Sequence, residues 1–519
     1  MKKSKKGFWI FICPALFAFI VVQIIPTIMG IGYSFTDWNG VGKTKNFVGL
    51  GNYITTLTND TQFRNAFLFT FLFSICAVIT VNVIGFALAM LVTQKIKGSN
   101  LLRGIFFMPN LIGGILLGFT WQFIFVQVFE AIGEKLQIGW LQGWLTNQKT
   151  GFIGLLIVVT WQLSGYMMMI YIAQIQNIPD SVLEAAQIDG AIGWNKLKSI
   201  ILPLMMPAFT IGLFLSISNA FKLFDQNISL TGGGPVNSTQ MLALNIYNTA
   251  FGENRFGLVK SSYLYDCGNG NFHYSAYNYK EKGGRGIMQK KKSINKMFLT
   301  IIGILLAIIF VAPILILVNS SFKTLQEIYI DILALPKHFS FQNYLKAFEK
   351  MDFLHSLINS LVITCVATVL ILLVSSMAAW VMVRYKTKVS KVLFLVFSAA
   401  LLIPFQCVML PLVDVMSKLH LMNRPGLIFM YIGFGCSMSI VLFHGFIKNI
   451  PVELEEAATI DGCNMFQTFF LIVLPLLKGI MATVAVINVM WIWNDFLLPS
   501  LIINKNGMQT LPLRTYLFF

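Results

Sequence analysis

The sequence predicts an all-α, polytopic membrane protein, folded as a helical bundle. Of its 519 residues, 56% are hydrophobic and only 11% are charged, whereas soluble proteins carry about 25% charged residues. Apolar runs long enough to cross the roughly 30 Å hydrocarbon core of a bilayer recur along the whole chain. These observations exclude a soluble enzyme, a disordered chain and a collagen.

The formal net charge of +17 is explained by where the basic residues lie. They cluster beside the ends of apolar runs, as at residues 2–6, 95–103, 290–296 and 384–391, and this is the bias of cytoplasmic loops in membrane proteins. No basic stretch carries the interleaved aromatic residues of a groove for single-stranded nucleic acid. We therefore expect a lipid bilayer as the partner, and no nucleic acid.

The seven cysteines and five histidines give no sign of a metal site or a disulfide framework. No two cysteines have the spacing of a Cys-x-x-Cys pair, and the histidines lie far apart in the chain. Zinc sites and disulfide scaffolds need such clusters. We therefore predict no metal.

Ten spans are predicted, in two sets of five, with boundaries uncertain by several residues. The first set lies near residues 8–31, 67–92, 105–128, 152–175 and 200–221. The second set lies near residues 297–318, 357–383, 392–415, 426–447 and 469–498. A lysine cluster precedes each set, which predicts a plasma- or inner-membrane protein with a cytoplasmic N-terminus.

The two sets are copies of one plan. The segment Asn177–Gly190 recurs as Asn449–Gly462, and in both copies a Leu-Pro pair follows before the next span. Since both copies start from the same side of the membrane, the repeat is parallel, unlike the inverted repeats of many ion-coupled carriers. The predicted halves are residues 1–257 and 288–519, and their cytoplasmic loops are residues 177–207 and 449–479.

Residues 258–287 form a polar junction that does not fit this plan. They are rich in Tyr, Asn and Gly and contain no 18-residue apolar stretch, so they cannot supply the sixth crossing that would bring Lys290 back inside. One hypothesis is a frameshift that joined two reading frames and removed the last helix of the first half; a further crossing is also due after Phe519. The alternative is an ordinary linker, and sequencing the coding DNA across the junction would decide between them.

The repeated loop predicts a docking element. Pro179 and Pro451 each begin a short helix whose paired alanines permit close approach, and an Asp-Gly turn ends it because Gly readily adopts positive φ. The loop contains no nucleophile–base pair and no set of metal ligands. The repeated loop therefore predicts a short helix and turn that bind a partner protein, and it predicts no catalytic residues.

The Glu-Ala-Ala and Asp-Gly pattern resembles the EAA loop of permeases from ABC importers. Three more segments, Phe47–Tyr53, Thr231–Pro235 and Trp493–Pro499, resemble the carbohydrate branch of that family, the maltose- and glycerol-phosphate-type permeases. The resemblance implies two permease subunits fused in one chain, six helices in each, a cytoplasmic ABC ATPase dimer, and an extracytoplasmic solute-binding protein that delivers the sugar. The coupling residues that it implies are Glu184, Ala185, Ala186, Asp189, Gly190 and Ala191 in the first loop and Glu456, Ala457, Ala458, Asp461, Gly462 and Cys463 in the second.

Nucleotide binding by the chain itself is not predicted. Gly42-Lys43-Thr44 imitates the end of a phosphate-binding loop, but Asp37 stands where the first Gly of that motif belongs. We therefore expect a transport permease without enzymatic activity and without a cofactor, in which ATP is used by the partner subunits.

Polar residues late in the fifth span of each half are the candidates for the substrate path. Polar groups are costly near lipid, so they are expected to face the interior of the bundle, and the resemblance places Asn219 where related permeases carry a sugar-contacting Asn. The alternative is that these residues form hydrogen bonds between helices. For Asn219 the two interpretations have equal support, and for the other candidates hydrogen bonding between helices is favoured. The candidates are Asn219, Lys222, Asn488, Trp491 and Asn494.

Three other functions are alternatives to a sugar permease. An ion-coupled carrier or channel needs intramembrane carboxylates or His, and the spans hold almost none. A membrane enzyme needs convergent His or Asp at span ends, and none is apparent. An inactive fusion product stays an alternative because of the junction at residues 258–287. The sequence also leaves the solute open between an oligosaccharide and a glycerol-phosphate-like compound.

Overall fold

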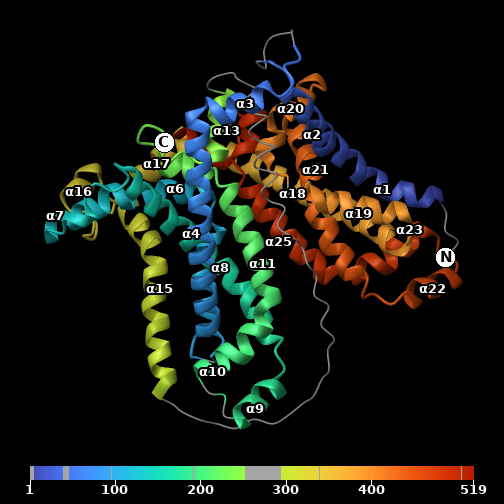
Figure 1. Ribbon diagram of the computed structural model, residues 1–519, viewed down its shortest axis with the longest axis horizontal. Helices are drawn as coiled ribbons and strands as arrows, with labels where there is room; N and C mark the ends of the chain where they lie inside the picture. The colour runs from blue at the N-terminus through green and yellow to red at the C-terminus, as the bar shows by residue number, and fades with distance from the viewer. Residues whose placement is uncertain are drawn as a thin grey trace. The chain divides into compact units, whose positions relative to one another are not determined.

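The computed structural model describes residues 5–38, 46–94, 96–189, 191, 193–251, 294–337, 339–401, 403–503, 505 and 507–518 (Figure 1). Among these residues the only β-type pairing is an isolated bridge between Thr36 and Phe47, and helices make up the rest of the regular structure. The predicted all-α class is confirmed. The boundaries predicted at 257 and 288, and the junction between them, lie outside the described residues.

The helices follow one another through two long series. Before residue 252 they are α1 (Lys5–Phe19), η1 (Ile20–Ile24), α2 (Ile25–Ser34), α3 (Gly51–Thr58), α4 (Thr61–Val92), α5 (Ser99–Phe107), η2 (Met108–Leu111), α6 (Gly114–Phe123), η3 (Ile124–Val128), α7 (Phe129–Leu136), η4 (Gly139–Leu141), α8 (Gln148–Gln176), α9 (Asp180–Ile188), α10 (Trp194–Lys196), η5 (Leu197–Ile201), α11 (Leu202–Phe221), α12 (Asp225–Leu230) and α13 (Leu242–Phe251). After residue 293 they are α15 (Ile294–Ser321), α16 (Leu325–Ile330), α17 (Gln342–Lys350), α18 (Phe353–Arg384), α19 (Lys388–Ala400), α20 (Phe405–Lys418), α21 (Arg424–Ile447), α22 (Glu453–Ile460), α23 (Met465–Gln467), η6 (Thr468–Val473), α24 (Leu474–Leu476), α25 (Lys478–Asn494), α26 (Leu497–Ile502) and α27 (Leu511–Phe518).

Eight helical stretches of the described chain are long and apolar enough to cross a membrane, and two sharply bent pairs raise the number to ten. This agrees with the two sets of five predicted spans. Many large apolar side chains on these helices are exposed, for example Ile79 on α4 and Ile309 on α15. Such exposure suits helices whose outer faces contact lipid, since lipid tails are as apolar as the side chains.

Three of the predicted spans are interrupted. The span predicted near 105–128 is broken by η2, where Pro109 follows Met108, and the span near 392–415 is broken between α19 and α20, where Pro404 precedes the second helix. The span near 469–498 bends by 77° at Leu477, shortly after Pro475. Proline removes a backbone donor and clashes with the preceding turn, so the helix ends or kinks there. The three interruptions therefore lie at or next to prolines of the predicted spans.

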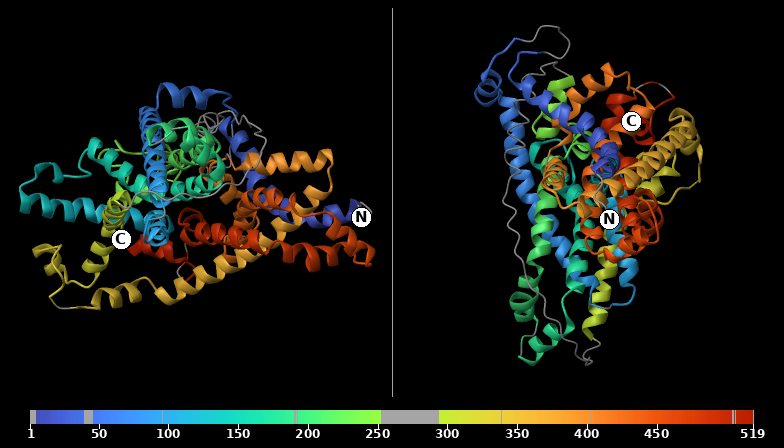
Figure 2. Two further views of the ribbon diagram at one scale, coloured as in Figure 1. Left: turned by 90° about the horizontal axis from the view of Figure 1, so that it is seen from below. Right: turned by 90° about the vertical axis from the view of Figure 1, so that its right-hand side faces the viewer.

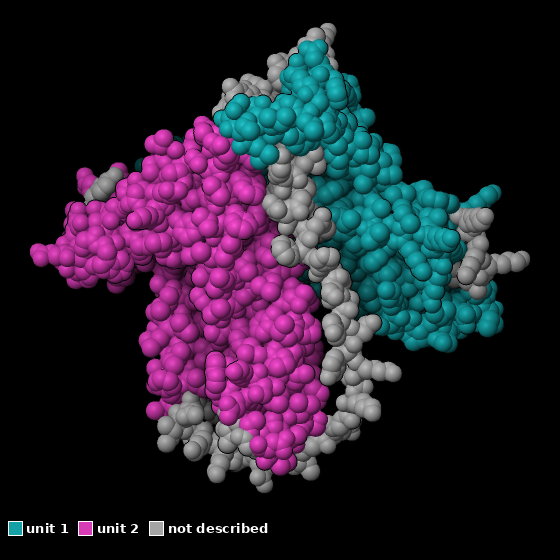
Figure 3. All heavy atoms as spheres, in the orientation of Figure 1, with its two compact units in different colours: residues 1–59, 246–270, 346–519 teal, residues 60–245, 271–345 magenta. Residues whose placement is uncertain are grey.

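The described chain divides into two compact units (Figure 3). Unit 1 contains residues 1–59, 246–270 and 346–519, and unit 2 contains residues 60–245 and 271–345. The first span of the chain therefore lies in a unit with the later helices of the second repeat. Conversely, α15, the first span of the second repeat, lies in a unit with the helices of the first.

Aromatic packing in unit 1 holds the N-terminal span against α18 and η6. The buried ring of Phe11 on α1 lies 5.3 Å from the ring of Trp380 and 5.4 Å from that of Phe469, edge to face in both cases. Gly433 on α21 allows close approach, because a Cβ atom there would lie 2.5 Å from the Cβ of Val22. Figure 2 shows α1, in blue, among the orange and red helices.

Unit 2 is organised around α4 and α8, with α5, α6 and α11 beside them. Helix α15 joins this bundle through Phe310, whose ring lies 5.0 Å from that of Phe106 on α5. At Gly165 on α8 a Cβ atom would lie 1.9 Å from the carbonyl oxygen of Phe106. Because glycine has no side chain, α8 can contact the backbone of Phe106, just before the break at η2.

Candidate functional site

The second repeated loop folds as the short helix α22 followed by a tight turn. The N–H of Asp461 donates to the carbonyl of Ala457 and that of Cys463 to the carbonyl of Ala458, both at 2.9 Å. Gly462 lies between them with φ +85°, a conformation that favours glycine. The turn predicted from Asp-Gly is therefore present, and it ends the helix as a left-handed C-terminal cap does.

The first loop makes the same two backbone hydrogen bonds. The N–H of Asp189 donates to the carbonyl of Ala185 at 2.9 Å, and that of Ala191 to the carbonyl of Ala186 at 2.8 Å, at the end of α9. Gly190 lies outside the described residues. The two loops thus share this pair of backbone hydrogen bonds as well as their sequence pattern.

The paired alanines of each loop face opposite ways. Ala186 and Ala458 are buried against their own units, whereas Ala185 and Ala457 are exposed. Beside the exposed alanines, Ile188 and Ile460 are each 86% exposed. Each loop therefore exposes an alanine and an isoleucine, with the acidic side chains of Glu184 and Glu456 next to them.

A buried ion pair fastens the second loop to the end of α18. The guanidinium of Arg384 donates to Oε1 of Glu455 from Nε at 2.8 Å and lies 2.7 Å from it through Nη2, and Nη2 also donates to the carbonyl of Ile450 at 3.0 Å. The two side chains are only 10% and 3% exposed. In the alignment of the repeats the residue that corresponds to Glu455 is Leu183, so the first loop has no equivalent carboxylate. The repeated sequence pattern therefore could not predict this ion pair.

The substrate-path candidates of the second half lie where α25 packs on α21. Asn488 is buried and donates from Nδ2 to Oγ of Ser439 at 3.1 Å and to the carbonyl of Val484 at 2.8 Å. The ring of Trp491 stands edge to face with that of Tyr431 at 5.5 Å, and Asn494 donates to the carbonyl of Met490 at 3.0 Å. Asn488 thus forms a hydrogen bond between two helices.

The candidates of the first half lie at the end of α11. Asn219 is exposed on this helix, and its Nδ2 donates to the carbonyl of Leu215 at 2.9 Å, one turn back. Its Oδ1 is an acceptor that can receive a hydroxyl hydrogen. Lys222 follows directly after the helix ends at Phe221.

A polar cluster inside unit 2 was missed by the sequence interpretation. The amide of Asn82 on α4 donates to Oγ of Ser216 on α11 at 2.8 Å, and its Oδ1 accepts a hydrogen bond from the hydroxyl of Tyr171 on α8. The cluster ties three helices together. Its signal was available, since an Asn in the middle of an apolar span marks a group that needs a partner.

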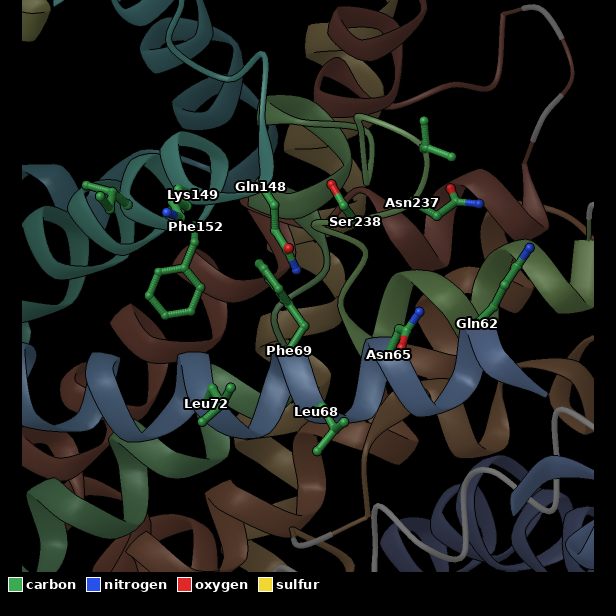
Figure 4. Close-up of a pocket in the computed structure, with 12 residues that line it drawn as sticks. Gln62, Asn65, Leu68, Phe69, Leu72, Gln148, Lys149, Phe152, Asn237 and Ser238 are labelled. Carbon is green, nitrogen blue, oxygen red and sulfur yellow. The ribbon is translucent and has the colours of Figure 1, made fainter. Parts of the chain in front are cut away.

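The Thr231–Pro235 segment forms a tight turn beside a pocket of about 850 Å³. Gly232 and Gly233 have φ +57° and +83°, which explains the glycines of the motif. The pocket is lined from α4, from α8 and from the loop after the turn, by residues that include Asn65, Gln148, Lys149, Phe152 and Asn237 (Figure 4). It offers both amide hydrogen-bond partners and an aromatic wall. In the part of the chain that the structure describes, no group of His, Cys, Asp or Glu could hold a metal ion.

Comparison with known families identifies the chain. Residues 82–328 and 371–519 match the family described as binding-protein-dependent transport system inner membrane component. The protein belongs to this family. Both repeated loops fall inside the matched residues, and the family makes this chain a multi-pass permease of the inner membrane.

Individual permeases resemble the chain over about half of its length. The probable starch degradation products transport system permease protein AmyD of Thermoanaerobacterium thermosulfurigenes is 53% identical over 249 residues, which are 48% of this chain and 85% of the relative. AmyC, described in the same words and from the same organism, is 44% identical over 230 residues, 44% of this chain and 84% of the relative. The multiple sugar-binding transport system permease protein MsmF of Streptococcus mutans is 32% identical over 254 residues, 49% and 87% of the two chains.

Proposed function

We propose that this permease conducts a carbohydrate across the membrane in a binding-protein-dependent ABC importer, and that α9 and α22 couple it to a separate ATPase dimer. The observation that carries the coupling is the pair of backbone hydrogen bonds repeated at the ends of α9 and α22, beside which Ile188 and Ile460 are equally exposed. The printed names of AmyD, AmyC and MsmF support a sugar as the solute. An extracytoplasmic solute-binding protein delivers it.

The mechanism follows from where the loops are attached. The lysine clusters support a cytoplasmic position for the N-terminus and both loops, because cytoplasmic loops carry an excess of Lys and Arg. ATP binding closes the ATPase dimer and moves the docked loops, and the second loop transmits this movement to α18 through Arg384. A partner can shift the equilibrium between inward- and outward-open states only if it binds the two states with different affinity. The ATPase supplies that difference, so the permease needs no cofactor.

Gly462→Val should uncouple the ATPase without unfolding the bundle. A β-branched residue is strained at φ +85°, and such strain costs about 1–3 kcal/mol, so the turn should rearrange. The added Cβ meets no atom within 4 Å, which leaves the core intact. We expect the ATPase that copurifies with the permease to fall about tenfold, since 1.4 kcal/mol is a factor of ten, at an unchanged melting temperature.

Gly479→Val is the matched control for this variant. A Cβ there also meets nothing within 4 Å, and the backbone is not in the left-handed region, so copurification should persist. Equal recovery of the ATPase with both variants would contradict the docking of α22. ATP hydrolysis by the purified permease alone would contradict the proposed function as a whole.

Asn219→Ala should weaken sugar transport through binding. Its exposed amide keeps an acceptor for a hydroxyl group, and the loss of one such contact costs about 0.5–1.5 kcal/mol, so the KM of uptake in proteoliposomes should rise about two- to twelvefold. Asn488→Ala should leave the KM unchanged and lower the melting temperature instead, because Asn488 bonds Ser439 between two helices. The reverse result would move the sugar contact from α11 to α25.

A further inference from the structure

A second cavity, of about 1070 Å³, lies in unit 1 beside the second loop. Its walls come from the end of α18, from α19, from the C-terminal end of α21 and from the start of α22. We call it the basic pocket. Its charged lining residues are Arg384, Lys386, Lys391, Lys448, Glu455 and Glu456.

The charges of the basic pocket favour an anion. Glu455 is occupied by Arg384 in the buried ion pair, which leaves Glu456 as the other carboxylate among the lining residues. The lining also includes three exposed lysines, Lys386, Lys391 and Lys448, and none of them is ion-paired to another described residue. Positive charges therefore outnumber the remaining carboxylate. They come from three different segments, so their positive field converges on one cavity.

The other wall of the basic pocket is apolar and continues onto an outward face. Phe394 and Leu395 of α19 line it, with the Phe394 ring stacked on that of His444 at 3.9 Å. Leu395 is 67% exposed, and Val392, one turn earlier, is 57% exposed. A free inorganic anion would contact only the lysines, whereas a molecule with a charged headgroup and hydrocarbon chains can contact both the lysines and the apolar face of α19.

We propose that the basic pocket binds the phosphate headgroup of an anionic phospholipid, with Lys386, Lys391 and Lys448 around the phosphate and the acyl chains along Leu395 and Val392. Basic pockets between membrane helices at the cytoplasmic side are suited to anionic headgroups. The pocket lies at the ends of α18 and α21, two helices long enough to span the bilayer, so its depth matches that of a headgroup. This inference rests on the cytoplasmic position of the second loop in the proposed function, and it does not depend on which solute is transported.

The test is lipid retention by the full-length permease, purified in detergent and titrated with phosphatidylglycerol or phosphatidylcholine. Native mass spectrometry counts the lipids that each protein molecule retains. We expect one phosphatidylglycerol bound more tightly than the rest, and no such phosphatidylcholine. A Lys391→Gln/Lys448→Gln variant should bind it about 30-fold more weakly, which corresponds to about 1 kcal/mol for each lysine.

The control is Lys346→Gln/Lys350→Gln, which removes the same charge from exposed positions on α17 of the same chain. It should change the affinity less than twofold. An equal loss in both variants would show a net-charge effect and overturn the proposal, and so would unchanged binding by the first variant. Binding of glycerol 3-phosphate with the same affinity as the lipid would assign the pocket to a free phosphate and would also overturn it.

Discussion

Gly165→Ala should destabilise the protein by about 3 kcal/mol or more, the upper end of what overpacking a core costs. The new Cβ would lie 1.9 Å from the carbonyl oxygen and 2.6 Å from the carbonyl carbon of Phe106. These are backbone atoms at the end of α5, so they cannot move aside as a flexible side chain can. Helices α5 and α8 must separate, and the aromatic packing around Phe106 is lost with them. Denaturant unfolding in detergent micelles measures the change.

Gly104→Ala, on α5 itself, is the control for this prediction. A Cβ at Gly104 meets no atom within 4 Å, and an Ala in a helix interior is favoured over Gly by about 1 kcal/mol. This variant should therefore be as stable as the parent protein or slightly more so. If the two alanines have the same effect, α5 and α8 do not touch at Gly165 in the way described.

Glu455→Leu should cost about 3–5 kcal/mol of stability, because it leaves the guanidinium of Arg384 buried without its partner. Leu is chosen since Leu183 occupies the aligned position of the first loop. The free energy of unfolding should fall, and cross-linking between α18 and α22 should weaken with it. A loss below about 1 kcal/mol would mean that the pair behaves like a solvent-screened surface pair.

Arg384→Met/Glu455→Leu should recover most of that loss. Replacing both members of a buried pair by apolar residues of similar volume is often neutral or stabilising. The double variant thus separates the cost of an unpaired charge from the contribution of the pair. Comparing its unfolding and its ATPase binding with those of the single variant also tests whether the tether between α18 and α22 matters for coupling beyond stability.

The sequence predicted the parts of this protein that depend on local chemistry. Apolar length identified the spans, and the Asp-Gly pair of the second loop predicted the left-handed turn that Gly462 makes. Pro109 and Pro404 were visible as prolines within or beside spans, but whether a proline kinks a helix or breaks it depends on what can satisfy the freed backbone groups nearby. Therefore the interruptions at η2 and before α20 could not be read from the residues alone.

Long-range partners were beyond the reach of pattern reasoning. The ion pair between Arg384 and Glu455 joins two residues that are adjacent only after α18 and α22 have packed. An Asn at position 82, within an apolar span, indicates that its amide needs a hydrogen-bond partner. The sequence does not indicate that the partners are Ser216 and Tyr171. The loops were predicted because they repeat, whereas the basic pocket has residues from several segments and no repeat to mark it.

The packing of Phe11 on Trp380 has a consequence for biosynthesis. A nascent chain leaves the ribosome from its N-terminus, so α1 is made first, and its neighbour on α18 follows roughly 370 positions later. At about 5–20 residues per second this interval is roughly 20–70 s. During that time the inner face of α1 has only lipid, or other segments already made, to cover it. The packing of α1 in unit 1 is therefore a late event, which cannot occur until α18 has been translated.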